Sequence, residues 1–199
     1  MSLKSYKPYT KSTRTTILVD RKNIWKGSPV KSLTRGKISS GGRNNLGRIT
    51  SRSKGAGHKK RYRIIDFYRN KIDVIGKVQR IEYDPNRTAR IALIRYENGT
   101  KSNFVAPHEI MVGQKISNGD VGPVQSGNSM SLSTMPTGTL VHNIEINPGK
   151  GGQLVKSAGT VAQVMAHESG YTLVRLPSGE MRRITVSYTH LTLPTSDLV

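Results

Sequence analysis

A run of short strands is predicted by residues 77–106, KVQRIEYDPNRTARIALIRYENGTKSNFVA. Apolar and polar residues alternate at its start, and the alternation stops at the turn sequence Asp84-Pro85-Asn86. Two further apolar runs flank Asn98-Gly99, the dipeptide that most strongly favours a tight hairpin turn. This stretch therefore predicts consecutive antiparallel strands that belong to a small β-barrel.

Strand patterns continue on both sides of this stretch. Residues 61–67 precede it and residues 110–116 follow it, which makes about five short strands separated by turn residues. A second set of strands is predicted at residues 139–146, 160–167, 171–176 and 181–186. No segment has the apolar spacing of a helix longer than about ten residues. A mainly β chain with two small barrels is expected.

Positive charge is concentrated at one end of the chain. The 199 residues include 32 Lys and Arg against 12 Asp and Glu, for a formal net charge of +20. Residues 1–80 hold 22 of the cations and only three acids, a net of +19, whereas residues 81–199 have a net of +1. Such a distribution is typical of a segment that binds a polyanion, because a general solubility effect would spread the charge evenly.

Several classes of protein are excluded by composition. The chain has no cysteine, which excludes disulfide scaffolds, zinc ribbons and thiol nucleophiles. No apolar run approaches the ~18 residues of a membrane helix, and no signal peptide is evident, so a soluble intracellular protein is expected. The five histidines form no close-spaced ligand set, and neither glycine cluster (residues 41–43 or 149–152) matches a phosphate-binding loop that precedes a helix. We therefore expect no metal, no cofactor and no enzymatic activity.

The densest functional signal lies in residues 41–63, where glycine, asparagine and cationic residues alternate. Glycine permits close backbone approach to phosphates, arginine offers a planar fork of donors, and asparagine can bind base edges or 2′-hydroxyls. A solvated basic tail would explain the charge but not this mixture. Because residues 1–57 contain few apolar side chains, we expect an extended arm that becomes ordered on its partner.

A second possible contact is the turn at residues 147–153. It is predicted to be a slender hairpin tip that presents Lys150 and exposed backbone donors to phosphate. An ordinary long turn explains the same residues equally well.

Several sequence motifs, found in order along residues 1–186, resemble those of the L-two family of large-ribosomal-subunit proteins, of the bacterial or organellar type. The words are Gly42-Arg43-Asn44-Asn45, Gly57-His58-Lys59, Ile65-Asp66-Phe67, Ile81-Glu82-Tyr83-Asp84-Pro85-Asn86-Arg87, His142-Asn143-Ile144-Glu145, Pro148-Gly149-Lys150-Gly151-Gly152-Gln153-Leu154 and Leu176-Pro177-Ser178-Gly179-Glu180.

The resemblance implies an oligonucleotide-binding (OB) barrel followed by an SH3-like barrel, both embedded in ribosomal RNA near the peptidyl-transferase region. The implied partners are large-subunit ribosomal RNA and neighbouring ribosomal proteins, with no membrane and no small-molecule substrate. The implied location is the cytoplasmic ribosome, rather than an organellar one. Two departures are visible: Ala56 replaces a glycine of the family pattern, and the pattern stops after Val186. We therefore expect a C-terminally truncated chain.

These observations predict five segments. They are an extended basic RNA-binding arm at 1–57, an OB-fold RNA-binding domain at 58–118, a linker at 119–134, an SH3-like barrel at 135–186 and a non-native tail at 187–199.

The residues expected to contact RNA are cations, together with small or amide residues beside them. They are Arg43, Asn44, Asn45, Arg48, Arg52, Lys54, Gly57, His58, Lys59, Lys60, Arg61, Arg63, Arg69, Lys71, Arg80, Arg87, Lys150, Gly151, Gly152, Lys156, Ser157, Arg182 and Arg183.

Three functions are compatible with such a chain. The first is a structural constituent of the large ribosomal subunit that binds ribosomal RNA and supports subunit assembly and association. The second is a small basic enzyme acting on nucleic acid, which would need a metal site or an acid/base pair that the sequence does not show. The third is a basic architectural nucleic-acid-binding protein outside the ribosome. Nucleic-acid preference separates it from the first, because the Gly/Asn/Arg segment suits irregular RNA better than a regular groove.

Overall fold

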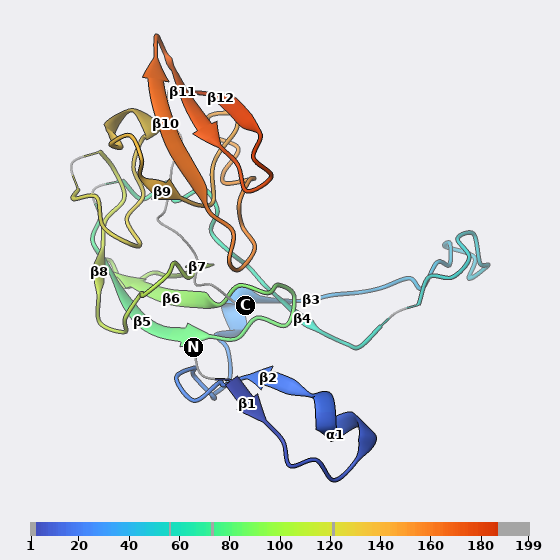
Figure 1. Cartoon of the computed structure of the whole chain (residues 1–199). Coiled ribbons are helices and arrows are strands. Elements are labelled where there is room, and N and C mark those ends of the chain that lie inside the picture. The colour runs from blue at the N-terminus through green and yellow to red at the C-terminus, as the bar shows by residue number, and fades with distance from the viewer. Residues whose placement is uncertain (1–2, 56, 73, 121, 187–199) are drawn as a thin grey trace.

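The computed structural model describes residues 3–55, 57–72, 74–120 and 122–186 (Figure 1). Two four-stranded antiparallel sheets form the body, one above the other in Figure 1, and two small two-stranded sheets precede them in the chain. This arrangement confirms the prediction of a mainly β chain with two small barrels. The predicted tail at residues 187–199 lies outside the described residues.

The first sheet has the strand order β7-β6-β5-β8. It consists of β5 (Gly76–Glu82), β6 (Ile91–Tyr96), β7 (Lys101–Val105) and β8 (Lys115–Ile116). The predicted Asn98-Gly99 turn joins β6 to β7, and Gly99 has a φ of +77°, as this turn type requires. A bulge in β5 between Val78 and Arg80 bends the sheet around a core that includes Val78, Ile94 and Phe104.

Strand β8 is much shorter than the strand predicted at residues 110–116. Only Lys115 and Ile116 pair with β5, because the residues before them form a turn. In that turn Gln114 N–H donates to Met111 O and Gly113 has a φ of +95°. The apolar residues Met111 and Val112 are therefore exposed at the turn rather than paired in the sheet.

The second sheet has the order β12-β11-β10-β9. Its strands are β9 (Leu140–Val141), β10 (Ala162–Glu168), β11 (Tyr171–Arg175) and β12 (Met181–Thr185). Strand β9 is shorter than the predicted strand at residues 139–146, because Asn143 has a φ of +55° and turns the chain away. Ile144 then pairs with Leu154 outside the sheet while its side chain stays in the second core.

The segment before the second sheet packs against it. Met130 and Leu132 are buried in the second core together with Val141, Val164 and Val174, and a 3₁₀ turn, η2 (Leu132–Thr134), follows. Residues 130–134 therefore fold with the second barrel, although the chain around them is rich in Gly and Ser.

The N-terminal part of the chain contains two hairpins. Strands β1 (Leu3–Ser5) and β2 (Ile17–Val19) pair around the short helix α1 (Lys11–Thr15), the one α-helix among the described residues. After the 3₁₀ turn η1 (Lys31–Leu33), strands β3 (Thr34–Gly36) and β4 (Arg61–Arg63) pair at the base of a long loop. Within the described part of the chain, no helix is long and apolar enough to cross a membrane.

The two barrels are in direct contact. Gly152 N–H donates to Phe67 O at 3.0 Å, and Ala158 N–H donates to the hydroxyl of Thr88 at 3.3 Å. Ala158 also packs against a small core of the first barrel that contains Ile91 and Val105. These contacts bury part of the turn at residues 151–158 of the second barrel against the first barrel.

Candidate nucleic-acid interface

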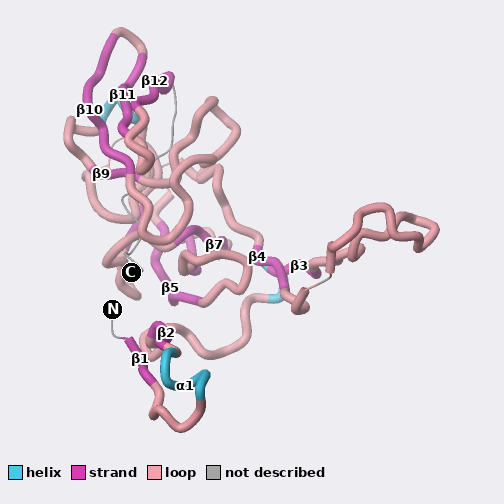
Figure 2. The backbone as a smooth tube through the Cα atoms, turned by 45° about the vertical axis from the view of Figure 1, so that its right-hand side comes forward, coloured by secondary structure: helices cyan, strands magenta, loops and turns pink. Residues whose placement is uncertain are grey.

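The most prominent surface feature is the loop of residues 37–60, which we call the basic hairpin. It leaves the body between β3 and β4 and projects far from both barrels (Figures 1 and 2). Its sequence contains seven Lys and Arg residues and no acid. No carboxylate within the hairpin neutralises these cations, so their positive field is directed at solvent.

The tip of the basic hairpin is an ordered turn. Arg43 pairs with Ile49 in an isolated antiparallel bridge. The side-chain oxygen of Asn44 accepts hydrogen bonds from the backbone N–H groups of Leu46 and Arg48, each at 3.0 Å. Asn44 therefore uses its amide oxygen to shape the turn, and Arg43 and Arg48 are held on its two sides.

Glycine is required where the two arms of this turn approach each other. Gly42 has a φ of +79°, and a Cβ at this position would lie 2.3 Å from Ser51 O. The carbonyl of Gly42 accepts hydrogen bonds from the backbone N–H groups of Thr50 and Ser51. Any larger residue would open the turn, since backbone atoms on both strands would have to move.

Most of the predicted contacts in this region are exposed. The structure brings together on the hairpin and at its base the exposed residues Arg43, Asn44, Asn45, Arg48, Arg52, Lys54, Gly57, His58, Lys59, Lys60 and Arg61, with Arg63 half-buried beside them.

On the first barrel, the predicted cations have partners within the fold. Arg87 forms an ion pair with the buried Asp84 at 2.7 Å, and Arg80 forms one with Glu82 at 2.7 Å. The ammonium group of Lys71 lies 4.2 Å from the centre of the Tyr96 ring. These cations are therefore held in fixed positions, and part of their charge is balanced locally.

Arg69 requires a correction. Its side chain is 1% exposed, and it donates to Asn118 Oδ1 at 3.0 Å and to Gly127 O at 2.8 Å. Burial lowers the pKa of Arg69 from its ordinary value, because the charged form loses hydration. A guanidinium in this position cannot reach a ligand on the surface. The Arg69 side chain connects the loop after β4 to residues 118–127. Arg69 is therefore a structural residue and does not belong to the interface.

The turn at residues 147–153 also differs from expectation. Gly151 and Gly152 are buried, and their N–H groups donate to Glu145 Oε1 and Phe67 O. The prediction of exposed backbone donors is therefore wrong for these two residues, because the turn docks against the first barrel. Lys150 remains exposed at the end of the turn.

Beside this docking site, two cations that are far apart in the sequence lie near the ring of Phe67. Lys156 Nζ lies 4.7 Å and the Arg87 guanidinium 5.7 Å from the centre of its ring. Ser157 is exposed next to them. Phe67 itself was not predicted as a site residue. Its occurrence in a strand pattern carries no indication that a loop from the other barrel packs over it.

Arg182 and Arg183 on β12 are exposed and paired with exposed acids. Arg182 lies 2.8 Å from Glu180, and Arg183 lies 3.6 Å from Glu168. Exposed ion pairs of this kind contribute little to the free energy of folding and break readily. Both arginines therefore remain accessible to an anion.

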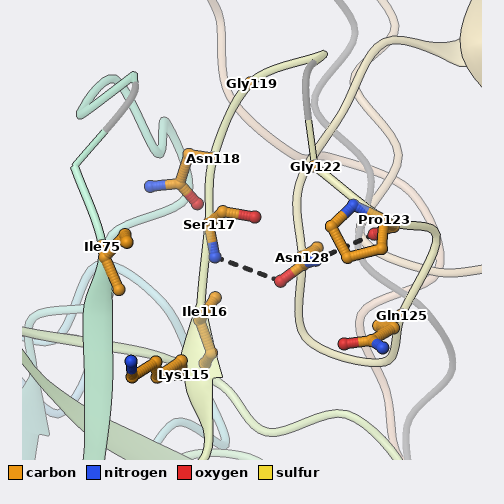
Figure 3. Close-up of a pocket in the computed structure, with 10 residues that line it drawn as sticks. All are labelled: Ile75, Lys115, Ile116, Ser117, Asn118, Gly119, Gly122, Pro123, Gln125 and Asn128. Atoms are coloured by element: carbon orange, nitrogen blue, oxygen red, sulfur yellow. Dashed lines mark hydrogen bonds between the residues drawn. The ribbon is translucent and has the colours of Figure 1, made fainter.

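One cavity of the first barrel opens beside β8 (Figure 3). The cavity between β8 and the following loop has a volume of about 370 Å³ and is lined by uncharged residues apart from Lys115 (Figure 3). Asn128 closes one side by accepting a hydrogen bond from Ser117 N–H at 3.1 Å. Nowhere in the described ranges do three His, Asp or Glu side chains lie close enough to hold a metal ion.

These features define a class: mainly β chains in which two packed small barrels carry a projecting basic hairpin. The comparison with known families is specific within that class. Residues 30–118 match the family model of the RNA-binding N-terminal domain of ribosomal proteins L2, and residues 125–189 match that of their C-terminal domain. The chain belongs to the ribosomal protein L2 family, which confirms the resemblance. Its sheets fit an OB barrel followed by an SH3-like barrel, as predicted.

Individual relatives agree with this assignment. The chain is 55% identical over 184 residues to the large ribosomal subunit protein uL2 of Ruegeria pomeroyi, which covers 92% of this chain and 66% of the relative. It is 56% identical to uL2 of Beijerinckia indica and 52% identical to uL2 of Rhodospirillum rubrum, each over 184 residues that cover 92% of this chain and 66% of the relative. The chain thus spans about two thirds of the length of these relatives.

Proposed function

We propose that this chain is a non-catalytic, RNA-binding constituent of the large ribosomal subunit. The observation that carries the proposal is the basic hairpin, with seven cations, no acid and an ordered tip, projecting from a chain of the ribosomal protein L2 family. A projecting, acid-free hairpin suits insertion between RNA helices, where phosphates approach from several sides.

In the mechanism that we infer, the basic hairpin and the two barrels contact RNA in different ways. The hairpin neutralises phosphates and releases their counterions, which supplies affinity. Its fixed tip limits the orientations in which Arg43 and Arg48 can meet RNA. The barrels provide further positioned cations, such as Lys150 and the Lys156 beside Phe67. The protein would thereby hold RNA segments together without chemistry of its own.

The finer parts of this proposal concern place and partners. Family resemblance supports a position near the peptidyl-transferase region, contacts with neighbouring ribosomal proteins, and roles in subunit assembly and association in the cytoplasmic ribosome. The proposed RNA contacts are the predicted residues without Arg69 and without the two buried glycines, Gly151 and Gly152. Gly151 and Gly152 would act by shaping the docked turn.

Crosslinking within purified ribosomal particles tests partner and position together. A photoreactive group placed at residue 45, at the exposed tip, should crosslink to large-subunit ribosomal RNA. The same group at residue 111, in the exposed turn before β8, is the control for an exposed position outside the basic hairpin. Absence of the chain from large-subunit particles would overturn the proposal. Equal crosslinking to RNA from both positions would remove the hairpin as its basis.

A further inference from the structure

Four exposed cations, none of them in the predicted interface, form a row across the first sheet. Lys101 on β7 pairs with Arg95 on β6, and Arg95 pairs with Lys77 on β5. Lys77 also pairs with Lys115 on β8. Residues paired in this way lie on the same face of a sheet, and neighbouring strands are about 4.8 Å apart. The row therefore crosses the whole sheet, whose strands are labelled β5 to β8 in Figure 1, and we call it the cation row.

The cation row destabilises the sheet that carries it, because like charges directly opposite each other on neighbouring strands repel. Among the residues that the structure describes, no carboxylate forms an ion pair with any of the four cations. Uncharged polar residues would satisfy the same strand pattern without this repulsion. Local features that oppose stability are typical of functional sites, so the row indicates that this face binds an anionic partner.

An apolar groove lies beside the cation row. It has a volume of about 590 Å³ and is bounded by β5, β6 and the turn before β8. All cations of the row except Lys101 line it, and Glu97 is the single acid among its lining residues. Ile75 and Val112 also line the groove, and they are 42% and 61% exposed. A partner that fits this surface therefore offers apolar side chains as well as negative charge.

The wall of the groove at the turn before β8 is held by backbone hydrogen bonds. Val78 N–H donates to Gln114 O at 2.9 Å, and Gly113 N–H donates to Val78 O at 2.8 Å. A Cβ at Gly113 would lie 3.9 Å from Lys77 Cε, so the stem of Lys77 runs along this turn. The charged and the apolar parts of the surface are therefore set side by side by the fold itself.

We propose that this surface binds an amphipathic helix of another protein, with carboxylates on the cation row and apolar side chains in the groove. One turn of an α-helix rises about 5.4 Å, so acids three or four residues apart come close to the ~4.8 Å step of the row. Acids on one side of an extended strand are about 6.7 Å apart and fall out of register with the row sooner.

Nucleic acid fits the groove less well than such a helix. Phosphates would bind the cation row but would leave Ile75 and Val112 without an apolar contact. Tyr96, the one aromatic residue among the lining residues, is 3% exposed, so bases find no ring on which to stack. The inference goes beyond the proposed function, because it adds a protein-binding surface that does not depend on RNA binding by the basic hairpin.

Fluorescence anisotropy of a labelled peptide tests this surface on the full chain. The probe is an amphipathic peptide of about 18 residues, long enough to form a helix, with Glu along one side and Leu beside it. Two control peptides keep the charge: one has Ser in place of Leu, and the other has a central Pro that breaks the helix. The probe should bind about tenfold more tightly than either control, because the controls lose the apolar contact or the spacing of the acids. Equal binding of all three peptides would overturn the inference.

Variants then locate the binding on the chain. Lys77→Gln combined with Arg95→Gln should weaken binding of the probe by about five- to tenfold, because two ion pairs are lost. Arg52→Gln combined with Lys54→Gln removes the same charge from the basic hairpin and should weaken it by less than about twofold. Val112→Ser should weaken it by about threefold through the apolar contact alone. Equal effects of the two double variants would overturn the inference.

Stability separates a binding role of the row from a structural one. Because the row is repulsive, Lys77→Gln should not lower the urea midpoint of the chain, although it weakens binding of the probe. A lower midpoint would show that Lys77 stabilises the sheet, and the argument from repulsion would fail.

Filter binding of a single-stranded RNA to the same variants distinguishes failure of this inference from failure of the proposed function. Lys77→Gln with Arg95→Gln should weaken RNA binding much less than Arg52→Gln with Lys54→Gln. If it weakens RNA binding equally and leaves binding of the probe unchanged, the row is an RNA contact, so the inference fails and the proposed function stands. The inference also fails if the probe does not bind the full chain. If the probe binds through the row but the chain binds no RNA, the proposed function fails and the inference stands.

Discussion

Gly149 and Gly151 occupy the same turn and have nearly the same φ, +78° and +76°, but their surroundings differ. A Cβ at Gly149 would meet nothing within 4 Å, whereas one at Gly151 would lie 3.2 Å from the carbonyl carbon and oxygen of Phe67. Gly149→Ala should therefore cost about 1–2 kcal/mol for the left-handed backbone alone. Gly151→Ala should cost a further ~1–3 kcal/mol because it pushes the two barrels apart.

Urea unfolding of both variants measures this difference directly. Equal losses of stability would contradict the contact between the turn and Phe67. Gly151 thus acts at the contact between the barrels, and not as an exposed backbone donor to phosphate.

A second residue-scale prediction concerns Arg69, which acts as a structural link. Arg69→Met removes the donors to Asn118 Oδ1 and Gly127 O and leaves two buried acceptors without these hydrogen bonds. The free energy of unfolding should fall by about 2–4 kcal/mol. RNA affinity should not change under conditions in which the variant is folded.

Arg52→Gln, on the basic hairpin, is the matched variant for Arg69. It removes an exposed charge and should lower RNA affinity with little effect on urea stability. If Arg69→Met weakens RNA binding while stability is unchanged, Arg69 belongs to the interface after all.

At the scale of elements, the basic hairpin and the barrels should be separable. Strands β3 and β4 pair from Thr34 and Arg63 to Gly36 and Arg61, so the loop between them can be replaced by Asn-Gly without altering their register. The shortened chain should keep its thermal midpoint, because none of the loop residues that the structure describes belongs to a barrel core. Its RNA affinity should fall sharply.

Amide hydrogen exchange of the unshortened chain provides an independent measurement. Exchange in residues 37–60 should be much faster than in β5 and β6, because few of the loop's backbone groups are buried. Uniformly slow exchange in the loop of the free protein would contradict its predicted dependence on RNA for full order.

At the scale of the whole molecule, affinity for RNA should depend steeply on salt. If about 6–10 of the cations in residues 1–80 contact phosphates, affinity should fall by about 10³–10⁵-fold between 50 and 200 mM salt on the duplex scale, and less for single strands. Filter binding across this range gives the slope. The shortened chain described above should have a smaller slope, and a flat response of the full chain would refute binding by counterion release.

The sequence alone determined the mainly β class through its local periodicity, and the hairpin at Asn98-Gly99 through its turn residues. It also determined the concentration of charge before residue 81, and its motifs determined the family. Tertiary structure decided which glycines and cations face solvent. Arg69 and Lys54 look alike in the sequence, but one is buried between loops and the other lies on a projecting hairpin. Burial depends on chain segments that are distant in sequence, such as residues 118–127 against Arg69 and residues 151–152 against Phe67. Local patterns carry no record of such contacts, since packing between barrels is set by the three-dimensional arrangement of both.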